Sequence, residues 1–142
     1  MKVKDLMNAK VIKIGERESV SVAARTMTHY NIGALPVCGS GGLLKGMITD
    51  RDIVIRCLAS NKDPNSTTVG QIMTPNVVSV QPDADVAAAA LMMGKRQVRR
   101  LPVVSGEKLC GMIALSDLAC NEDVSYDAAD ALANISTNIL GD

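Results

Sequence analysis

A hydroxyl and a carboxylate stand one helical turn apart at Thr49 and Asp52, where an apolar run gives way to a helical pattern. Free N–H groups at a helix start favour an anion, and Thr49 adds a hydroxyl donor on the same side. The Asp52 carboxylate can accept two hydrogen bonds, which suits the vicinal hydroxyls of a ribose. These residue types are compatible with contact to a sugar phosphate. Ser, Thr and Asp are also the commonest helix caps, so the pair taken alone favours capping.

The elements that position this pair belong to an internal repeat. When Val3 is aligned with Val69, apolar residues coincide along both halves, and Leu35-Pro-Val falls on Leu101-Pro-Val. After one residue is lost in a turn, Gly46-Met-Ile falls on Gly111-Met-Ile. A repeat of this length is a supersecondary unit, so we expect two similar halves packed about a pseudo-twofold axis.

Each half has the pattern of a β-α-β-β-α unit, which places the chain in the α/β (α+β) class. The first half predicts a strand at 11–14, a helix capped by Ser19 and ending near Asn31 or Gly33, strands at 34–38 and 43–49, and a helix at 50–59. Pro36 lacks an N–H, so it is expected at a sheet edge or bulge. The second half repeats this order at 77–80, 85–96, 100–104, 109–114 and 116–120.

The predicted organisation has four parts: repeat 1 at 1–62, a polar linker at 63–68, repeat 2 at 69–121 and a C-terminal amphipathic helix at 122–142. In the last part, one helical stripe covers an exposed face or a partner subunit. The stripe is made of Ala128, Leu132, Ile135 and Ile139.

Composition excludes several classes of function. The formal net charge is zero, which argues against non-specific nucleic-acid binding, although Lys95, Arg96, Arg99 and Arg100 form a local basic cluster. No signal peptide or membrane-spanning run is present, so a cytoplasmic protein is expected. The four cysteines and the single His29 lack metal-ligand spacing, and we expect the cysteines to be small core residues. No catalytic set and no phosphate-binding P-loop is found, so we expect no enzyme activity.

The order, spacing and duplication of these motifs resemble a tandem pair of cystathionine-β-synthase (CBS) domains, also called a Bateman module, as found in small stand-alone bacterial proteins. The resemblance is carried by three runs in each copy: Val-x-x-(Leu/Ile)-Met at 3–7 and 69–73, (Ile/Val)-x-x-Leu-Pro-Val at 32–37 and 98–103, and Gly-Met-Ile-x-x-x-Asp at 46–52 and 111–117. It covers residues 1 to about 121. The family's (Ser/Thr)-x-x-Asp motif uses the hydroxyl for phosphate and the carboxylate for ribose, and Thr49 and Asp52 match it.

The resemblance implies a regulatory module that binds an adenosine-containing ligand in the cleft between copies. AMP, ADP and ATP are candidates, with NAD and S-adenosylmethionine as further ones, and no cofactor is required. Small residues at Gly33 and Ala34 would let a purine approach the backbone, and Arg51 is a candidate phosphate contact. The neighbouring strands supply candidate contacts at Ile12, Lys13 and Pro36, which are otherwise simply parts of core strands.

The second copy departs from this pattern. Ala114 replaces Thr49, Arg99-Arg100 replaces Gly33-Ala34, and Asp117 remains. We therefore expect one intact site on Asp52 and a poor or altered one on Asp117. Alternatively, an arginine of this pair supplies positive charge for a phosphate, or both are ordinary surface residues.

The family commonly forms homodimers that make a four-repeat disc, and its modules report to an effector protein that this sequence does not name. Three other functions stay open: a dimeric interaction protein with vestigial sites, a weak nucleic-acid binder that uses the basic cluster, and a thiol-redox protein that uses Cys38.

Overall fold

The computed structural model describes residues 1–141, apart from the side chains of residues 124 and 137–141. The chain forms two compact units, each built mainly from one repeat. The first-repeat unit is Ile12–Val77, and the second-repeat unit joins Met1–Val11 to the chain from Val78 onward. The opening segment of each repeat therefore packs in the unit formed by the other repeat. The alignment of the repeats alone does not predict this exchange.

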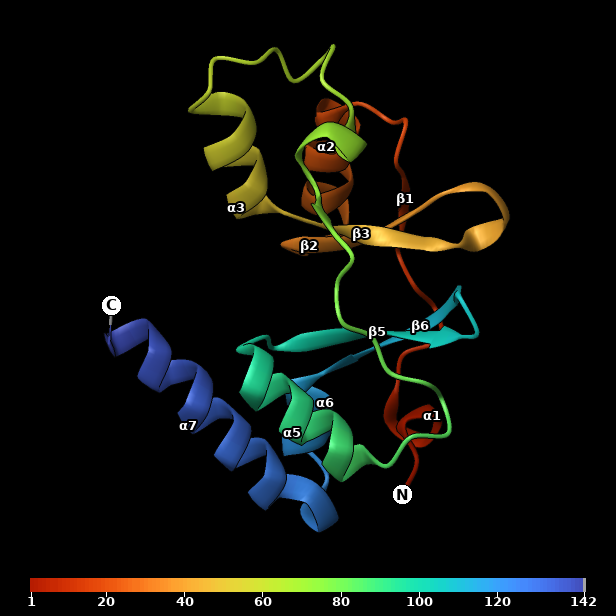
Figure 1. Cartoon of the computed structure of the whole chain (residues 1–142), viewed down its shortest axis with the longest axis vertical. Coiled ribbons are helices and arrows are strands. Elements are labelled where there is room, and N and C mark those ends of the chain that lie inside the picture. The colour runs from red at the N-terminus through yellow and green to blue at the C-terminus, as the bar shows by residue number, and fades with distance from the viewer. Residues whose placement is uncertain (142) are drawn as a thin grey trace. The chain divides into compact units, whose positions relative to one another are not determined.

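The first-repeat unit contains a sheet with strand order β1-β2-β3-β4. β1 is parallel to β2, whereas β3 is antiparallel to both β2 and β4. Helices α2 and α3 lie on one side of strands β2 and β3 (Figure 1). The elements are β1 (Ile14–Gly15), α2 (Val20–Tyr30), β2 (Ala34–Cys38), the 3₁₀ turn η1 (Ser40–Gly42), β3 (Leu44–Thr49), α3 (Asp50–Asp52), the π-helical η2 (Ile53–Leu58), α4 (Val69–Ile72) and β4 (Thr74–Pro75).

The second-repeat unit is a reduced copy of the same arrangement. Its β5–β6 hairpin corresponds to β2–β3, and single bridges replace the two outer strands. Val80 bridges to Val103 in parallel, and Asn8 bridges to Met112 in antiparallel orientation. The elements are α1 (Val3–Leu6), α5 (Val86–Arg96), β5 (Arg100–Ser105), β6 (Lys108–Ala114), α6 (Leu115–Ala119), the 3₁₀ turn η3 (Glu122–Val124) and α7 (Ser125–Gly141).

Each unit has its own aliphatic core, as the lack of Phe and Trp requires. In the first-repeat unit, Leu35 and Ile48 have no exposed surface, and their aligned partners Leu101 and Ile113 have none in the second. Burial of each such side chain contributes about 1.5–3 kcal/mol to folding. The duplicated apolar pattern thus produces two equivalent cores.

The helix ends follow local sequence chemistry. Ser19 caps α2 as predicted, because the Val22 N–H donates to its Oγ at 3.2 Å. The left-handed residue that ends α2 is Asn31 (φ 53°), the earlier of the two predicted positions, and Gln97 (φ 57°) does the same for α5. Asn tolerates this conformation because its short polar side chain can hydrogen-bond locally.

Two predicted strands are shorter than expected. The strand predicted at 11–14 is only Ile14–Gly15, which pairs with Val37 and Cys38, and the one at 77–80 is reduced to the Val80 bridge. The sequence predicts Pro36 at an edge or a bulge. Its strand is an inner one, so the edge alternative is wrong, but β2 has a register shift directly after Val37, one residue beyond Pro36. The missing N–H is tolerated because β1 pairs only with Val37 and Cys38.

The helix predicted at 50–59 forms, but most of it is π-helical. The Ala59 N–H donates to the Val54 carbonyl and the Lys62 N–H donates to the Cys57 carbonyl, at 2.8 and 2.9 Å. Short π-helical stretches often mark functional segments.

Helix α7 is present, but its buried stripe differs from the prediction. Ala128 and Ile135 are buried, whereas Leu132 is 43% exposed and Ala131 is buried instead. α7 packs closely on α5 at Gly94, where an added Cβ would lie 3.3 Å from the Ala131 Cα, so a small residue is needed. The side chain of the predicted stripe residue Ile139 and the predicted helix end at residue 142 lie outside the described part of the chain.

Candidate ligand-binding site

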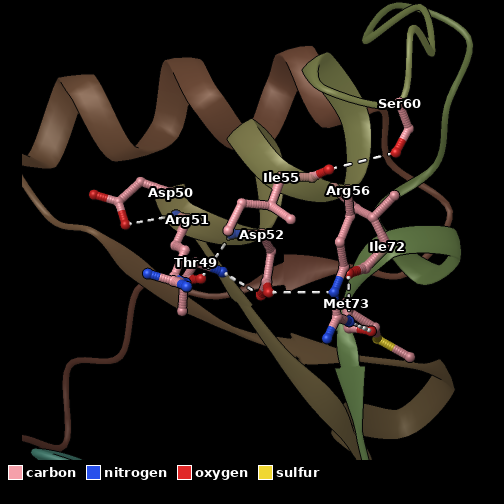
Figure 2. A network of polar contacts seen from close by, with 9 residues as sticks. All are labelled: Thr49, Asp50, Arg51, Asp52, Ile55, Arg56, Ser60, Ile72 and Met73. Carbon is pink, nitrogen blue, oxygen red and sulfur yellow. Dashed lines mark hydrogen bonds and ion pairs between the residues drawn. The ribbon is translucent and has the colours of Figure 1, made fainter. Parts of the chain in front are cut away.

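The first junction, Thr49–Asp52, is where β3 ends and α3 begins. The Asp52 N–H donates to the Thr49 Oγ1 at 3.0 Å, and the Thr49 N–H donates to the Asp52 Oδ2 at 3.0 Å (Figure 2). This reciprocal pair is a capping box, so the capping interpretation is confirmed. Thr49 Oγ1 only accepts in this box, so its hydroxyl proton is available to another partner. The second carboxylate oxygen of Asp52 also takes no part in the box.

That second oxygen, Oδ1 of Asp52, lies 3.7 Å from Nε of Arg56. The Asp52 side chain is only 13% exposed, whereas that of Arg56 is 48% exposed. Nη1 of Arg56 donates to the carbonyls of Ile72 and Met73, at 3.2 Å each (Figure 2). Sequence reasoning missed Arg56. The signal that could have identified it is its i, i+4 spacing from Asp52.

Gly33 and Ala34 lie beside the first junction, as predicted. Ala34 pairs with Thr49 in the β2–β3 register, and the Gly33 carbonyl accepts from the Asp50 N–H at 2.9 Å. A Cβ on Gly33 would come within 3.0 Å of the Asp50 Oδ2. Arg51 is exposed, and its backbone N–H donates to the Asp50 Oδ1 at 2.8 Å.

A hollow of about 530 Å³ opens beside this junction, on the helix side of the first-repeat unit. We call it the α2–η2 groove. Gly33 and Asp50 contribute to its wall, whereas Thr49 and Asp52 do not. The groove is lined by Ala24, Met27, Thr28, Asn31, Ile32, Gly33, Asp50, Ile53 and Val54. It is thus distinct from the predicted site, although the two share an edge at Gly33.

The three remaining candidates of the first repeat differ in exposure. Ile12 is half-buried and packs against the core, and Lys13 is exposed. Both precede β1 rather than lying in it. Pro36 is buried and pairs with Met47. The structure therefore brings together Thr49, Asp52, Gly33 and Ala34 by direct bonds and strand register. The roles of Ile12, Lys13 and Pro36 as ligand contacts stay predictions.

The second junction, Ala114–Asp117, has half of this arrangement. The Ala114 N–H donates to the Asp117 Oδ2 at 2.8 Å, but Ala114 has no hydroxyl to return a bond. Arg100 pairs with Ala114 in the β5–β6 register, and the Arg99 carbonyl accepts from the Leu115 N–H at 2.7 Å. Both arginines are exposed. They line a hollow of about 340 Å³ with Ala114, Leu115, Ser116, Ala119 and Leu132.

The thiols and the histidine show no arrangement for redox or metal chemistry. All four cysteines are free, and Cys38 and Cys57 are buried, but Cys120 is exposed, so the prediction that all are core residues is wrong for Cys120. Burial raises the pKa of the Cys38 thiol and so disfavours the reactive thiolate, although nearby Lys13 acts weakly in the opposite direction. Exposed His29 makes an edge-to-face contact with Tyr30.

Across the described part of the chain, no three His, Cys, Asp or Glu residues are grouped so that they could hold a metal ion. Within the same residues, no helix has the length and apolar character needed to cross a bilayer.

Comparison with known proteins agrees with the duplicated architecture. Residues 3–58 and 69–120 each match the family model of the CBS domain. The chain belongs to the CBS-domain family. Hypoxic response protein 1 of Mycobacterium tuberculosis is 42% identical to this CBS-domain protein over 116 residues, which cover 82% of this chain and 81% of the relative.

Two solved structures are similar to this CBS-domain protein. The crystal structure of Hypoxic Response Protein I with two coordinated zinc ions has a TM-score of 0.79 at 41% identity, and the match covers 84% of this chain and 97% of that one. The CBS domain pair of protein MJ0100, in complex with 5′-methylthioadenosine and S-adenosyl-L-methionine, has a TM-score of 0.74 at 32% identity. That match covers 84% of this chain and 93% of the other. The predicted family and fold class are confirmed.

Proposed function

We propose that this CBS-domain protein is a regulatory module that binds an adenosine-containing ligand at the first junction and performs no catalysis. The observation that carries the proposal is that the Thr49–Asp52 capping box does not use the Thr49 hydroxyl proton or Oδ1 of Asp52. The box fixes both side chains, yet it leaves one hydroxyl proton and one carboxylate oxygen for a ligand. A fixed pair of this kind loses little side-chain entropy when a ligand binds.

The groups available fit the parts of a nucleoside. Oδ1 of Asp52 accepts hydrogen bonds from ribose hydroxyls, and the Thr49 hydroxyl donates to a phosphate oxygen. Gly33 and Ala34 leave the backbone open to a flat base, because neither carries a bulky side chain. The ligands bound in the MJ0100 structure share an adenosine moiety, which supports this class of ligand. AMP, ADP, ATP, NAD and S-adenosylmethionine are the candidates.

The second junction is proposed as a poor or altered site. Ala114 cannot donate to a phosphate oxygen, and Arg99 and Arg100 add bulk where the first repeat has Gly33 and Ala34. The two arginines bring positive charge to the adjacent hollow, which is the one feature that favours an anion there.

Ligand-induced thermal stabilisation tests the proposal, because a ligand that binds only the folded state raises its stability by mass action. At a concentration of about 100 times Kd the gain is roughly 2.7 kcal/mol. We would screen the five candidates against wild type, Asp52→Asn and Asp117→Asn. Asparagine keeps an amide oxygen for the capping bond, so neither variant should unfold.

We expect the stabilisation to be lost in Asp52→Asn and retained in Asp117→Asn. If no candidate stabilises the wild-type protein, the proposed function is wrong. Equal losses in the two variants would instead refute the difference between the junctions.

We also propose that the protein forms a homodimer through the α2–η2 groove. In the second-repeat unit, the aligned helix residues Ala90, Met93 and Leu118 are almost fully buried, and α7 packs on both helices that carry them. Among the described residues of the first-repeat unit, no helix covers the groove in this way. Val54 in its wall and the nearby Ile55 and Leu58 are 55%, 47% and 53% exposed, which is unusual for large aliphatic side chains on one helix.

The occupant we propose is the same groove of a second copy, because a patch of small and aliphatic residues is complementary to itself under twofold symmetry. Sedimentation equilibrium should give twice the monomer mass of 14.9 kDa for wild type. Val54→Lys should shift the equilibrium toward monomer. Tyr126→Lys, at an 87% exposed residue of α7, is the matched control and should stay dimeric. A monomeric wild type would overturn this part of the proposal.

A further inference from the structure

We propose that Arg56 is a positioning residue that ties the Asp52 carboxylate to the end of α4, so that ligand binding at Asp52 and the order of the α4–β4 segment are coupled. This inference rests on the proposed function for its ligand and on the structure for the tie itself. Arg56 matches none of the repeat motifs discussed above.

The contacts of Arg56 connect two separate elements of the first-repeat unit. Nε lies 3.7 Å from Oδ1 of Asp52, and Nη1 donates at 3.2 Å to two successive carbonyls, those of Ile72 and Met73. These carbonyls belong to the last residue of α4 and to its C-cap residue, where the helix itself provides no N–H partners. The planar, multi-donor guanidinium can reach both sides at once, whereas a lysine ammonium cannot.

The segment held by Arg56 also completes the sheet. Directly after Met73, Thr74 and Pro75 form β4 and pair with Met47 and Gly46 of β3. Strand β3 then leads to Thr49, whose N–H donates to Asp52. Arg56 therefore closes a ring of contacts that runs from β3 through the first junction and α4–β4 back to β3. Beyond β4 the chain leaves this unit and enters the other at Val78.

The second repeat lacks this tie. The residue aligned with Arg56 is Asn121, which is uncharged. Its Oδ1 accepts from the Asp123 N–H at 3.0 Å, and its Nδ2 lies 3.7 Å from the Met1 sulfur. The coupling would thus operate at the first junction, which is also the one that keeps the hydroxyl.

The geometry indicates how a ligand would use the tie. The 3.7 Å contact is an ion pair longer than a hydrogen bond, so a ribose hydroxyl can donate to Oδ1 without breaking a hydrogen bond. Arg56 holds this oxygen in place before the ligand arrives, and binding in turn restrains Arg56 and the carbonyls of Ile72 and Met73. By thermodynamic linkage, a ligand that binds more tightly when the α4–β4 segment is ordered must also stabilise the ordered form of that segment.

The tie is tested without ligand by amide hydrogen exchange at Met73, whose N–H donates to the Val69 carbonyl at 2.9 Å. Arg56→Gln and Arg56→Lys should each speed this exchange by about fivefold, since the last turn of α4 frays. The aligned amide of Met7, which donates to Val3 at 2.9 Å in α1, is an internal control and should not change. Arg25→Gln, at an exposed arginine of α2, is the matched control variant.

The coupling is tested with AMP and S-adenosylmethionine as probes. We expect the stabilising probe to slow Met73 exchange in wild type, and we expect about tenfold weaker binding in Arg56→Gln, which corresponds to roughly 1.4 kcal/mol. Unchanged Met73 exchange in both Arg56 variants overturns the tie, and unchanged affinity overturns the coupling. If neither probe nor any other of the five candidate ligands binds wild type, the proposed function and the coupling both fail, while the ligand-free exchange still decides whether the tie exists.

Discussion

Exchanging residues between the two junctions should separate the capping role of Thr49 from its proposed role in ligand binding. Thr49 completes a capping box with Asp52. At the second junction only one of the two bonds forms, from the Ala114 N–H to the Asp117 carboxylate. Thr49→Ala removes one half of the first box, and Ala114→Thr supplies the missing half of the second. The residue introduced at 114 has room, because Ala114 borders the hollow of about 340 Å³.

The expected magnitudes follow from the geometry of the bond that is lost or gained. The Oγ1 of Thr49 accepts at 3.0 Å in a half-buried position, and loss of such an N-cap costs about 1 kcal/mol. Thr49→Ala should therefore lower the midpoint of thermal unfolding by roughly 2–4 °C for a chain of this size. Ala114→Thr should raise it by about 1–3 °C, less than the loss at Thr49 because ordering the introduced side chain offsets part of the gain.

Urea and thermal unfolding followed by circular dichroism, without nucleotide, measure both effects. Thr49→Ser is the control that keeps a hydroxyl oxygen and should lie within about 0.5 kcal/mol of wild type. The reasoning is refuted if Thr49→Ala is as stable as wild type or if Ala114→Thr is destabilising. With nucleotide, Thr49→Ala should also show a reduced thermal shift, whereas Ala114→Thr should retain the wild-type shift.

Three further experiments test the packing. Ile135→Ala should cost about 2–4 kcal/mol in urea unfolding because its side chain is 3% exposed, while Leu132→Ala should cost under about 1 kcal/mol. Similar large losses at both positions would restore the predicted stripe, in which both side chains are buried. Gly46→Ala should lower the free energy of unfolding by about 1–3 kcal/mol more than Gly111→Ala does. The new Cβ at 46 meets a backbone carbonyl of β4, whereas the one at 111 meets a methionine sulfur that can move. Similar losses in the two variants would contradict this. Ellman's reagent at pH 8 should label Cys120 first, half-buried Cys110 more slowly, and buried Cys38 and Cys57 only on unfolding. Rapid labelling of more than two thiols would contradict the burial of Cys38 and Cys57.

The elements that could be predicted are those whose causes are local in sequence. The cap at Ser19 and the junction at Thr49 each depend on bonds that span three residues, so their patterns are visible in the chain itself. The strands 34–38 and 43–49 were found because a hairpin needs only neighbouring residues and a Gly-rich turn. The strand predicted at 11–14 is longer than the observed one, because β propensity does not indicate how many residues pair with a strand that is distant in sequence.

The candidate site was predicted in part for the same reason. Thr49, Asp52 and the adjoining Gly33-Ala34 are close together because strand pairing brings the ends of β2 and β3 to one place. Arg56 could not be predicted in this role because it donates to the carbonyls of Ile72 and Met73. No local sequence pattern shows that these carbonyls lie beside Arg56.

By itself, the sequence determined the duplication, the order of the elements, the aliphatic cores and the difference between the two junctions, because each follows from residue types at fixed local spacing. Only the tertiary structure decided which opening segment packs in which unit, which stripe of α7 is buried, and what Arg56 holds. These depend on contacts between distant parts of the chain, where a close approach such as Gly94 on Ala131 selects among faces of similar hydrophobicity.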